Sequence, residues 1–331
     1  MHRVTAAVAR VNHRLEAWLW PILLVTTAVG LFVKGYARPL EPLLPYLLTY
    51  NILVTSLNCS LAQFAAIGRR LWLLAAPLAV LFLLLPALGF AMSRTVLAGH
   101  QGLGAGLILV TMIPSGVTGS VWTSLSGGNV SLSIAIVSVS NVLSVGLIPA
   151  LFSWLGGRQV AVDAGQLLDN LLRTVLVPAV VGTVVNTRWR SQVDRVRPWL
   201  ALGVKGVIVL FTLITAARLR ISGAGPAEVA LATGCVALLV AAGYVTGYLM
   251  TLFGPAAARE DRISVMYACG TRNHFVGLSV ATLFLPPAAV VAVLISNLFN
   301  HPAASVVHRL LHKGWVLRPE ASAARRLSGA T

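Results

Sequence analysis

Runs of about twenty apolar residues recur along nearly the whole chain, and this pattern restricts the fold more than any other feature. A helix needs about 20 apolar residues to cross the roughly 30 Å hydrocarbon core of a bilayer. Hydrophobic residues make up 57% of the 331 residues and charged residues only 10%, whereas soluble domains carry about 25% charged residues. We therefore expect an integral membrane protein. Intrinsic disorder, a coiled coil and a secreted disulfide scaffold are excluded.

Ten runs have the length of membrane-spanning helices. They cover residues 17–33, 43–61, 71–92, 103–126, 129–154, 165–187, 199–217, 227–253, 263–284 and 286–312. The pattern predicts an all-α membrane protein of about ten transmembrane helices. Residues 1–16 are basic and lead into the first run without a clear cleavage site, so we expect a cytoplasmic N-terminal segment rather than a signal peptide.

The distribution of Lys and Arg predicts the orientation, because cytoplasmic loops are enriched in these residues. With the N-terminus inside, the inner set contains Arg3, Arg10, Arg14, Arg69, Arg70, Arg188, Arg190, Arg195, Arg197, Arg259, Arg262, Arg309, Lys313, Arg318, Arg325 and Arg326. The outer set is only Lys34, Arg38, Arg94, Arg158, Arg218 and Arg220. Both termini, including the tail 313–331, are therefore predicted to be cytoplasmic, in an inner or plasma membrane. The net charge of +16 then reflects topology and contact with anionic lipids, not binding of nucleic acid.

An internal repeat divides the ten spans into two sets of five. Residues 139–143 (VSNVL) and 295–299 (ISNLF) lie 156 positions apart, and the same offset aligns Pro114 with Gly270. Because five is an odd number of crossings, the second set must enter the membrane from the opposite side. Such inverted repeats are typical of secondary transporters. The two predicted five-helix repeats cover residues 17–154 and 165–312.

Spans four and nine contain residues that interrupt a regular helix. Residues 111–120 (TMIPSGVTGS) combine a proline with two glycines, and residues 268–275 (ACGTRNHF) place a cation, an amide and an imidazole in an apolar stretch. Backbone groups freed inside a membrane must be satisfied by protein or by a water-filled cavity. We predict two broken helices whose half-helix N-termini face a substrate anion. The alternative is a pair of ordinary kinks.

Arg272 is the most informative single residue. An arginine in mid-membrane costs roughly 2.5–3.5 kcal/mol even on the translocon scale. All nine carboxylates are assigned to loops, tails or span starts: Glu16, Glu41, Asp163, Asp169, Asp194, Glu228, Glu260, Asp261 and Glu320. The guanidinium is therefore satisfied either by a bound organic anion or by backbone carbonyls of the broken helices.

The predicted substrate-binding residues are the polar side chains of the two breaks. They are Arg272, Asn273, His274, Ser115, Thr118 and Ser120. His274 is interpreted either as a packed polar residue or as a proton carrier. No zinc-protease, nucleophile-elbow or phosphate-loop motif is present, and the three cysteines lack metal-ligand spacing. The sequence thus predicts no enzyme, no metal site and no cofactor.

The broken stretches resemble the bile acid:sodium symporter family, including its bacterial members. Residues 114–120 followed by 125–133 (LSGGNVSLS) resemble that family's P-G-G-T-A-S-N turn and G-N-V-A-L-S helix start. Residues 270–273 (GTRN) followed by Gly277 and Leu278 resemble its G-M-Q-N-S-G-L motif. The resemblance covers essentially the whole chain. It implies a panel of helices 1, 2, 6 and 7 beside a core of helices 3–5 and 8–10, with helices four and nine crossing at their unwound centres.

The positions that hold sodium in that family are altered. The Ser-Asn pair aligns with Gly119 and Ser120, one helix-five serine is kept as Ser133, and the remaining ligands align with Val137, Ala268, Arg272 and Leu81. The carboxylate ligand is thus replaced by alanine, and a guanidinium nearby would repel a cation in a low-dielectric site. The resemblance therefore implies transport, while these substitutions predict that sodium coupling is lost.

The resulting hypothesis is a secondary transporter that moves a small organic anion by alternating access within the lipid bilayer. One alternative is a sodium symporter with a rebuilt ion site made of Ser120, Asn129, Ser133 and the backbone near Ala268. Another is a membrane sensor on the same scaffold that does not transport. No pattern in the sequence specifies an oligomeric state.

Overall fold

The computed structural model describes residues 2–33, 36–58, 71–156, 162–217, 225–253, 257–314 and 316, and its regular elements are all helices. The α-helices are α1 (His2–Phe32), α2 (Leu44–Ser56), α4 (Trp72–Ala79), α5 (Leu85–Thr95), α6 (Gln101–Met112), α7 (Val117–Leu125), α8 (Val130–Leu151), α9 (Ala164–Leu171), α10 (Val177–Arg188), α11 (Arg190–Ala217), α12 (Pro226–Phe253), α13 (Arg259–Gly270), α14 (His274–Phe284) and α15 (Pro287–His312). A 3₁₀ helix precedes α2 at Arg38–Leu43. The prediction of an all-α protein is confirmed.

Two of the predicted spans contain a π-helical turn in their interior rather than a break, and a third such turn, Phe152–Gly156, follows α8. The turn at Val80–Leu84 joins α4 to α5, and the turn at Leu172–Leu176 joins α9 to α10. In each case a proline follows two residues later, Pro86 or Pro178. A proline cannot donate the hydrogen bond expected in a helix interior, and the wider turn accommodates that loss. Each joined pair therefore remains one long apolar helix.

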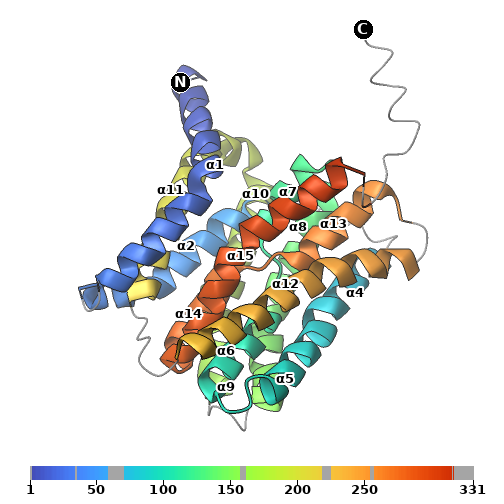
Figure 1. Ribbon diagram of the computed structural model, residues 1–331. Coiled ribbons are helices and arrows are strands. Elements are labelled where there is room, and N and C mark those ends of the chain that lie inside the picture. The colour runs from blue at the N-terminus through green and yellow to red at the C-terminus, as the bar shows by residue number, and fades with distance from the viewer. Residues whose placement is uncertain are drawn as a thin grey trace.

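The first helix begins much earlier than the first predicted span. α1 runs from His2 to Phe32 and includes Pro21, so residues 2–16 continue as helix into the predicted span at 17–33. Figure 1 shows the first turns of α1 projecting past most of the other helices. Only Trp18–Phe32 is apolar enough to lie in a bilayer, and it is 15 residues long.

Length and composition identify fewer spans than the ten predicted. Among the described residues, six helices are long and apolar enough to cross a membrane, and the bent pair α6–α7 makes a seventh. Three predicted spans fall short for separate reasons. The first is short in its apolar part, and the second ends as a helix at Ser56 before residues 59–70, which lie outside the described set. The ninth is divided by the polar residues 271–273 into α13 of 12 residues and α14 of 11 residues. The structure thus supports six or seven spans by this measure, not ten.

The helices pack in two groups. α1 packs against α11 and α2 against α10, and α2 and α10 both contact α11. The other group contains α4 to α8 and α12 to α15, in which α6 packs between α5 and α15, and α13 contacts α7, α8 and α12. Figure 1 shows α1, α2 and α11 on one side of the molecule and α4, α5, α12 and α13 on the other.

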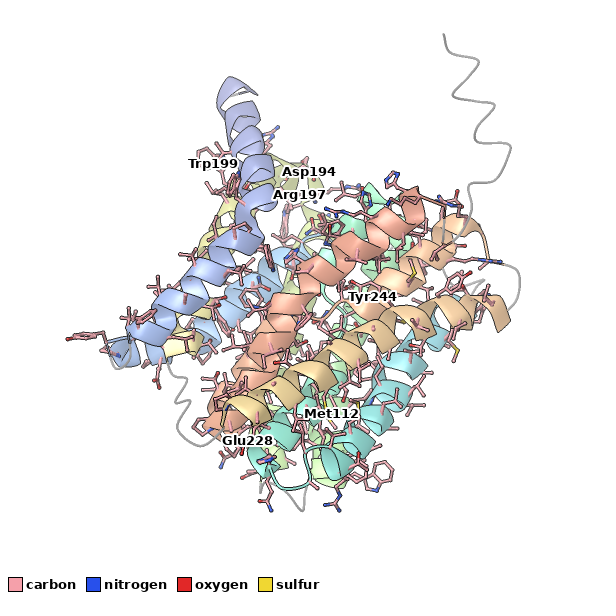
Figure 2. The ribbon with its side chains drawn as sticks, viewed as in Figure 1. Met112, Asp194, Arg197, Trp199, Glu228 and Tyr244 are labelled. Atoms are coloured by element: carbon pink, nitrogen blue, oxygen red, sulfur yellow. The ribbon has the colours of Figure 1, made fainter. Side chains whose placement is uncertain are left out.

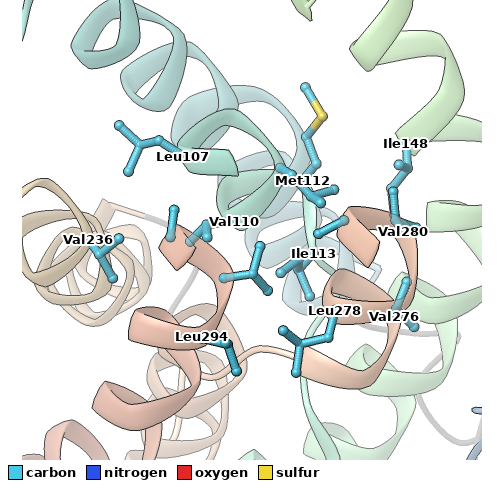
Figure 3. Packing of buried hydrophobic residues seen from close by; sticks show 14 of the residues in the cluster. Leu107, Val110, Met112, Ile113, Ile148, Val236, Val276, Leu278, Val280 and Leu294 are labelled. Atoms are coloured by element: carbon cyan, nitrogen blue, oxygen red, sulfur yellow. The ribbon is translucent and has the colours of Figure 1, made fainter. Parts of the chain in front are cut away.

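The broken helices lie in the interior of the second group. All residues of α6 from Leu103 to Met112 are buried, as are most residues of α14. Figure 3 shows Ile113 packed among Leu278, Val276 and other apolar side chains of α14 and α15. A helix that is apolar on every face is expected to be enclosed by others. This enclosure fixes the position of the interrupted segments.

Candidate functional site

The two interrupted segments touch at their unwound centres. α6 and α7 form a pair bent by 55°, and α13 and α14 are separated by residues 271–273. The backbone N–H of Asn273 donates to the carbonyl of Pro114 at 2.8 Å. A Cβ atom at Gly116 would overlap the carbonyl group of Arg272, so only glycine permits this approach. The breaks are therefore one crossing point.

α12 closes over this crossing. The ring of Tyr244, labelled in Figure 2, lies so close to Gly270 that a Cβ atom there would overlap it. Tyr244 also meets Tyr267 edge-on, with ring centroids 6.0 Å apart. The glycine at the end of α13 thus allows an aromatic ring to cover the break.

Asn141 on α8 joins both breaks through its side chain. Its Nδ2 donates to the carbonyl of Ser115 at 3.3 Å and to that of Val137 at 2.7 Å. Its Oδ1 accepts from Nδ2 of Asn273 at 2.8 Å. The neighbouring Ser140 hydroxyl accepts from the backbone N–H of Ser115 at 3.2 Å. Both backbone groups of Ser115 in the first break are therefore satisfied by α8.

Arg272 is buried at the crossing, with 6% of its surface exposed. Its Nη1 donates to the carbonyl of Ile113 at 3.4 Å. Within the described part of the chain, no carboxylate oxygen lies within 4.0 Å of the guanidinium. The contact with Ile113 is the backbone-carbonyl alternative stated above, and it leaves the positive charge without a nearby acid.

Three more of the predicted polar residues contact α15 or remain unpaired. Nε2 of His274 lies 3.0 Å from Oγ of Ser296, and Thr118 accepts from Nδ2 of Asn300 at 3.2 Å. The buried hydroxyl of Ser115 has no hydrogen-bond partner among the described residues. His274 is therefore packed inside the helical core rather than exposed at its surface.

The residues of the alternative ion site are only partly brought together. Ser120 and Ser133 share a hydrogen bond at 3.1 Å, and Thr123 donates to Ser133 at 3.3 Å. Asn129 caps α8, with its Oδ1 accepting from the backbone of that helix. Ala268 lies in a separate apolar cluster and is fully buried. The hydroxyl pair is thus satisfied internally, and Ala268, which the resemblance aligns with a carboxylate ligand, offers only a methyl group.

One carboxylate is placed differently from the sequence interpretation. Asp261 was assigned to a loop, but it lies in the first turn of α13 with 4% of its surface exposed. Its Oδ1 accepts from Nδ2 of Asn129 at 2.8 Å, and the hydroxyl of Ser264 donates to the carbonyl of Asn129. This buried acid fastens the start of α8 to α13. It is not a partner of Arg272.

A cavity of about 240 Å³ lies where the two groups of helices meet, beside the first turn of α7. Its lining comes from α2, α7, α8 and α10, with Asn58 just beyond α2. The lining residues are Ile52, Thr55, Ser56, Asn58, Val117, Ser120, Ile134, Val137, Ser138, Asn141, Val142, Ala179, Val180, Thr183 and Val184. The volume is below the roughly 300–1,000 Å³ of drug-sized pockets. None of the lining side chains from the described residues is charged.

Only some of the predicted site residues line this cavity. Ser120 lines it, whereas Arg272, Asn273 and His274 do not. Asn141 lines it and also holds the crossing, yet the sequence marked this residue only as part of the repeated VSN motif. The sequence did not indicate the cavity hydroxyls of α2 and α10. No local pattern shows which helices of the two groups lie next to each other.

Comparison with known proteins decides the family. A model of the SBF-like CPA transporter family matches residues 18–314. The chain belongs to this family. As a member of the SBF-like CPA transporter family it is a multi-pass membrane transporter and not an enzyme. The resemblance to bile acid:sodium symporters is thereby confirmed at the level of the family.

Several curated proteins are similar along most of the chain. YbaS from Bacillus subtilis (strain 168) is 25% identical over 301 residues, which are 88% of this chain and 96% of YbaS. The probable sodium/metabolite cotransporter BASS2, chloroplastic, from Oryza sativa subsp. japonica is 27% identical over 80% of this chain and 62% of its own length. YocS from Bacillus subtilis, described as a sodium-dependent transporter, is 23% identical over 74% of this chain and 75% of its own.

Proposed function

We propose that this member of the SBF-like CPA transporter family moves a small organic anion across the membrane by alternating access, without coupling to sodium. The observation that carries the proposal is the cavity between the two helix groups, directly beside the crossing of the broken helices. In transporters built from discontinuous helices, substrates bind near such half-helix ends. The modest volume favours a substrate much smaller than a steroid.

The preference for an anion follows from the groups around the cavity. Val117 is the first residue of α7 and lines the cavity. No side chain caps this helix. The N–H of Gly119 bonds to the carbonyl of Gly116, and those of Val117 and Thr118 remain available to a ligand. The described lining residues include no carboxylate, and the nearby crossing holds the buried cation of Arg272. Both features favour negative charge.

The ten-span, inverted-repeat arrangement belongs to the same proposal. When the two halves are exchanged, span one corresponds to span six, span two to span seven, and so on. The contact of α1 with α11 then corresponds to the contact of α10 with α2, and the contact of α6 with α15 corresponds to that of α13 with α8. Likewise α5 with α6 matches α12 with α13, and α7 with α8 matches α14 with α15. Such paired contacts are what two related five-helix units would produce.

The orientation proposed from the charges places the cavity in the cytoplasmic half. Nη2 of Arg197 donates to the carbonyl of Leu57 at 3.3 Å, so the end of α2 lies beside the basic segment at the start of α11. Figure 2 shows Arg197 with Asp194 and Trp199 at one end of the molecule and Glu228 at the other. With the basic end inside, this conformation would receive or release substrate on the cytoplasmic side.

Independence from sodium is supported by the chemistry of the altered positions. Sodium prefers hard oxygen ligands, but Ala268 and Leu81 are fully buried apolar residues. The Ser120 and Ser133 hydroxyls bond to each other. A fixed guanidinium at the crossing supplies a positive charge of the kind that a bound sodium ion would bring.

Sodium-coupled metabolite transport is the second candidate, and the names of two relatives favour it. BASS2 is described as a probable sodium/metabolite cotransporter and YocS as a sodium-dependent transporter. If this chain resembles them in coupling, its ion must be held by backbone carbonyls with Ser120 and Ser133. Sodium dependence separates the two candidates.

The test uses purified full-length protein with a panel of carboxylates, in sodium or choline chloride at equal ionic strength. A ligand that binds only the native state raises the unfolding temperature, so we expect stabilisation by an anion in both salts. The stabilising anion is then assayed for uptake into proteoliposomes. Uptake that rises tenfold or more in sodium would favour the second candidate. Binding without uptake or counterflow would indicate a sensor.

A further inference from the structure

Two threonine hydroxyls that line the cavity have already used their hydrogens. Thr183 on α10 donates to the carbonyl of Ala179 at 2.9 Å. Thr55 on α2 donates to the carbonyls of Asn51 at 2.8 Å and Ile52 at 3.0 Å. A threonine hydroxyl has one hydrogen and two lone pairs. Towards the cavity, both residues therefore offer acceptors and no donor.

Asn141, on the opposite wall, also has no hydrogen left to donate. Both hydrogens of its Nδ2 are directed to the carbonyls of Ser115 and Val137. Its Oδ1 accepts one hydrogen bond, from Asn273, and a carbonyl oxygen has two lone pairs. The remaining bonding capacity of this side chain at the cavity is therefore that of an acceptor. Acceptors thus line both the α2–α10 wall and the α8 wall.

Donors for an anion come from the start of α7 and the end of α2, where Ser56 and Asn58 line the cavity and Nδ2 of Asn58 uses one of its two hydrogens on the carbonyl of Thr55. At the start of α7, Val117 lines the cavity and has one backbone N–H, and no side chain caps this helix. A ligand whose only polar group is a carboxylate would bind these donors. Its carbon atoms would then face the acceptors on the two walls. A ligand with an additional hydroxyl or ammonium group would use both sets.

We propose that the cavity selects carboxylates that also carry a hydrogen-bond donor, namely hydroxy acids or amino acids, over anions of equal size that carry none. This inference rests on the proposed function and specifies its substrate class. The aliphatic lining by Ile52, Ile134, Val180 and Val184 adds a preference for a short branched hydrocarbon tail. Sites that hydrogen-bond a substrate hydroxyl discriminate against the analogue without it because their polar groups are then left unpaired.

Four compounds of one carbon skeleton test the proposal: α-hydroxyisovalerate, valine, isovalerate and α-ketoisovalerate. Their dissociation constants for the purified full-length protein are measured by calorimetry in choline buffer. We expect α-hydroxyisovalerate or valine to bind about tenfold more tightly than isovalerate and α-ketoisovalerate. The two favoured compounds separate a hydroxyl donor from an ammonium donor.

The matched variants are Thr183→Val and Thr55→Val, which remove an acceptor from the cavity without changing its size. Each should reduce the tenfold preference to about threefold or less while leaving isovalerate binding within twofold. Thr233→Val is the control, because Thr233 makes the same bond to its own helix at Val229 but lies on α12, outside the cavity lining. It should leave the preference unchanged. Unfolding temperatures of all three variants without ligand show whether they fold.

Each result decides one proposal. Equal affinity for the four compounds, or a preference unaffected by both cavity variants, would overturn the donor-selectivity inference and leave anion transport standing. Absence of binding by all four compounds, together with no hit in the wider carboxylate panel, would instead overturn the proposed function.

Discussion

The side chain of Asn273 donates to that of Asn141 at 2.8 Å, and this bond joins the second broken span to the fifth helix of the first half. Asn273 precedes α14, and its backbone N–H also bonds to Pro114 in the first break. One asparagine pair therefore connects both interruptions with the wall of the cavity. A substrate that contacts Asn141 touches the residue that holds the crossing together.

Removal of either partner of this pair should destabilise the protein. Interhelical hydrogen bonds in membrane proteins contribute about 0.6 kcal/mol on average and up to about 1.7 kcal/mol. We expect Asn141→Ala to reach the upper part of this range, because it also loses two bonds to backbone carbonyls. Unfolding in detergent measures Asn141→Ala, Asn273→Ala and the double variant. Additive losses would show that the two amides are not coupled, and the exposed Asn58→Ala provides the baseline.

Gly116 should not tolerate a methyl group. A Cβ atom there overlaps the carbonyl of Arg272, and overpacking of this kind costs about 1–3 kcal/mol. Gly146→Ala is the matched control, since nothing lies within 4 Å of the added carbon and alanine favours a helix. Folded yield and unfolding temperature should fall for Gly116→Ala alone. Equal behaviour of the two variants would contradict the close crossing.

The charge of Arg272 should matter more than its shape. It does not line the cavity, so it acts on an anion across several ångströms, where a unit charge is worth about 1–2 kcal/mol at an effective dielectric constant near 20. Arg272→Lys should therefore keep the affinity for the identified anion within about threefold, whereas Arg272→Gln should lose about tenfold. Calorimetry with that anion provides the measurement. If Arg272→Gln binds as tightly as the parent, the arginine is structural and the anion is held elsewhere.

The proposed orientation predicts opposite accessibility at two exposed positions. Ser191 lies in the basic segment at the start of α11, and Ala98 lies between α5 and α6. Cysteines at these positions, in a background without Cys59, Cys235 and Cys269, are treated with an impermeant thiol reagent on intact cells. Ala98→Cys should be labelled from outside, and Ser191→Cys only after the membrane is opened. Labelling of Ser191→Cys in intact cells would invert the topology.

The sequence alone determined that the chain is helical, membrane-embedded and interrupted in its fourth and ninth apolar runs. These properties are local: the length of an apolar run and the presence of proline and glycine act within a few turns of helix. It also indicated the family through residues 114–133 and 270–278. Asp169 pairs with Arg173 at 2.9 Å, and such a pair is local too, because neighbours four residues apart on one helix face need no tertiary contact.

Only the tertiary structure decided which polar groups meet. Asp261 was indistinguishable in sequence from a loop carboxylate, yet it is buried against Asn129 from a helix more than a hundred residues earlier. Asn141 gained its role because α8 packs against both breaks, and Thr55 and Thr183 became neighbours of one cavity because α2 packs on α10. Arg272 reaches a backbone carbonyl and not the cavity lining. Hydrogen bonds act over about 3 Å, so the composition of a site formed between distant segments depends on how those segments pack, which no local pattern encodes.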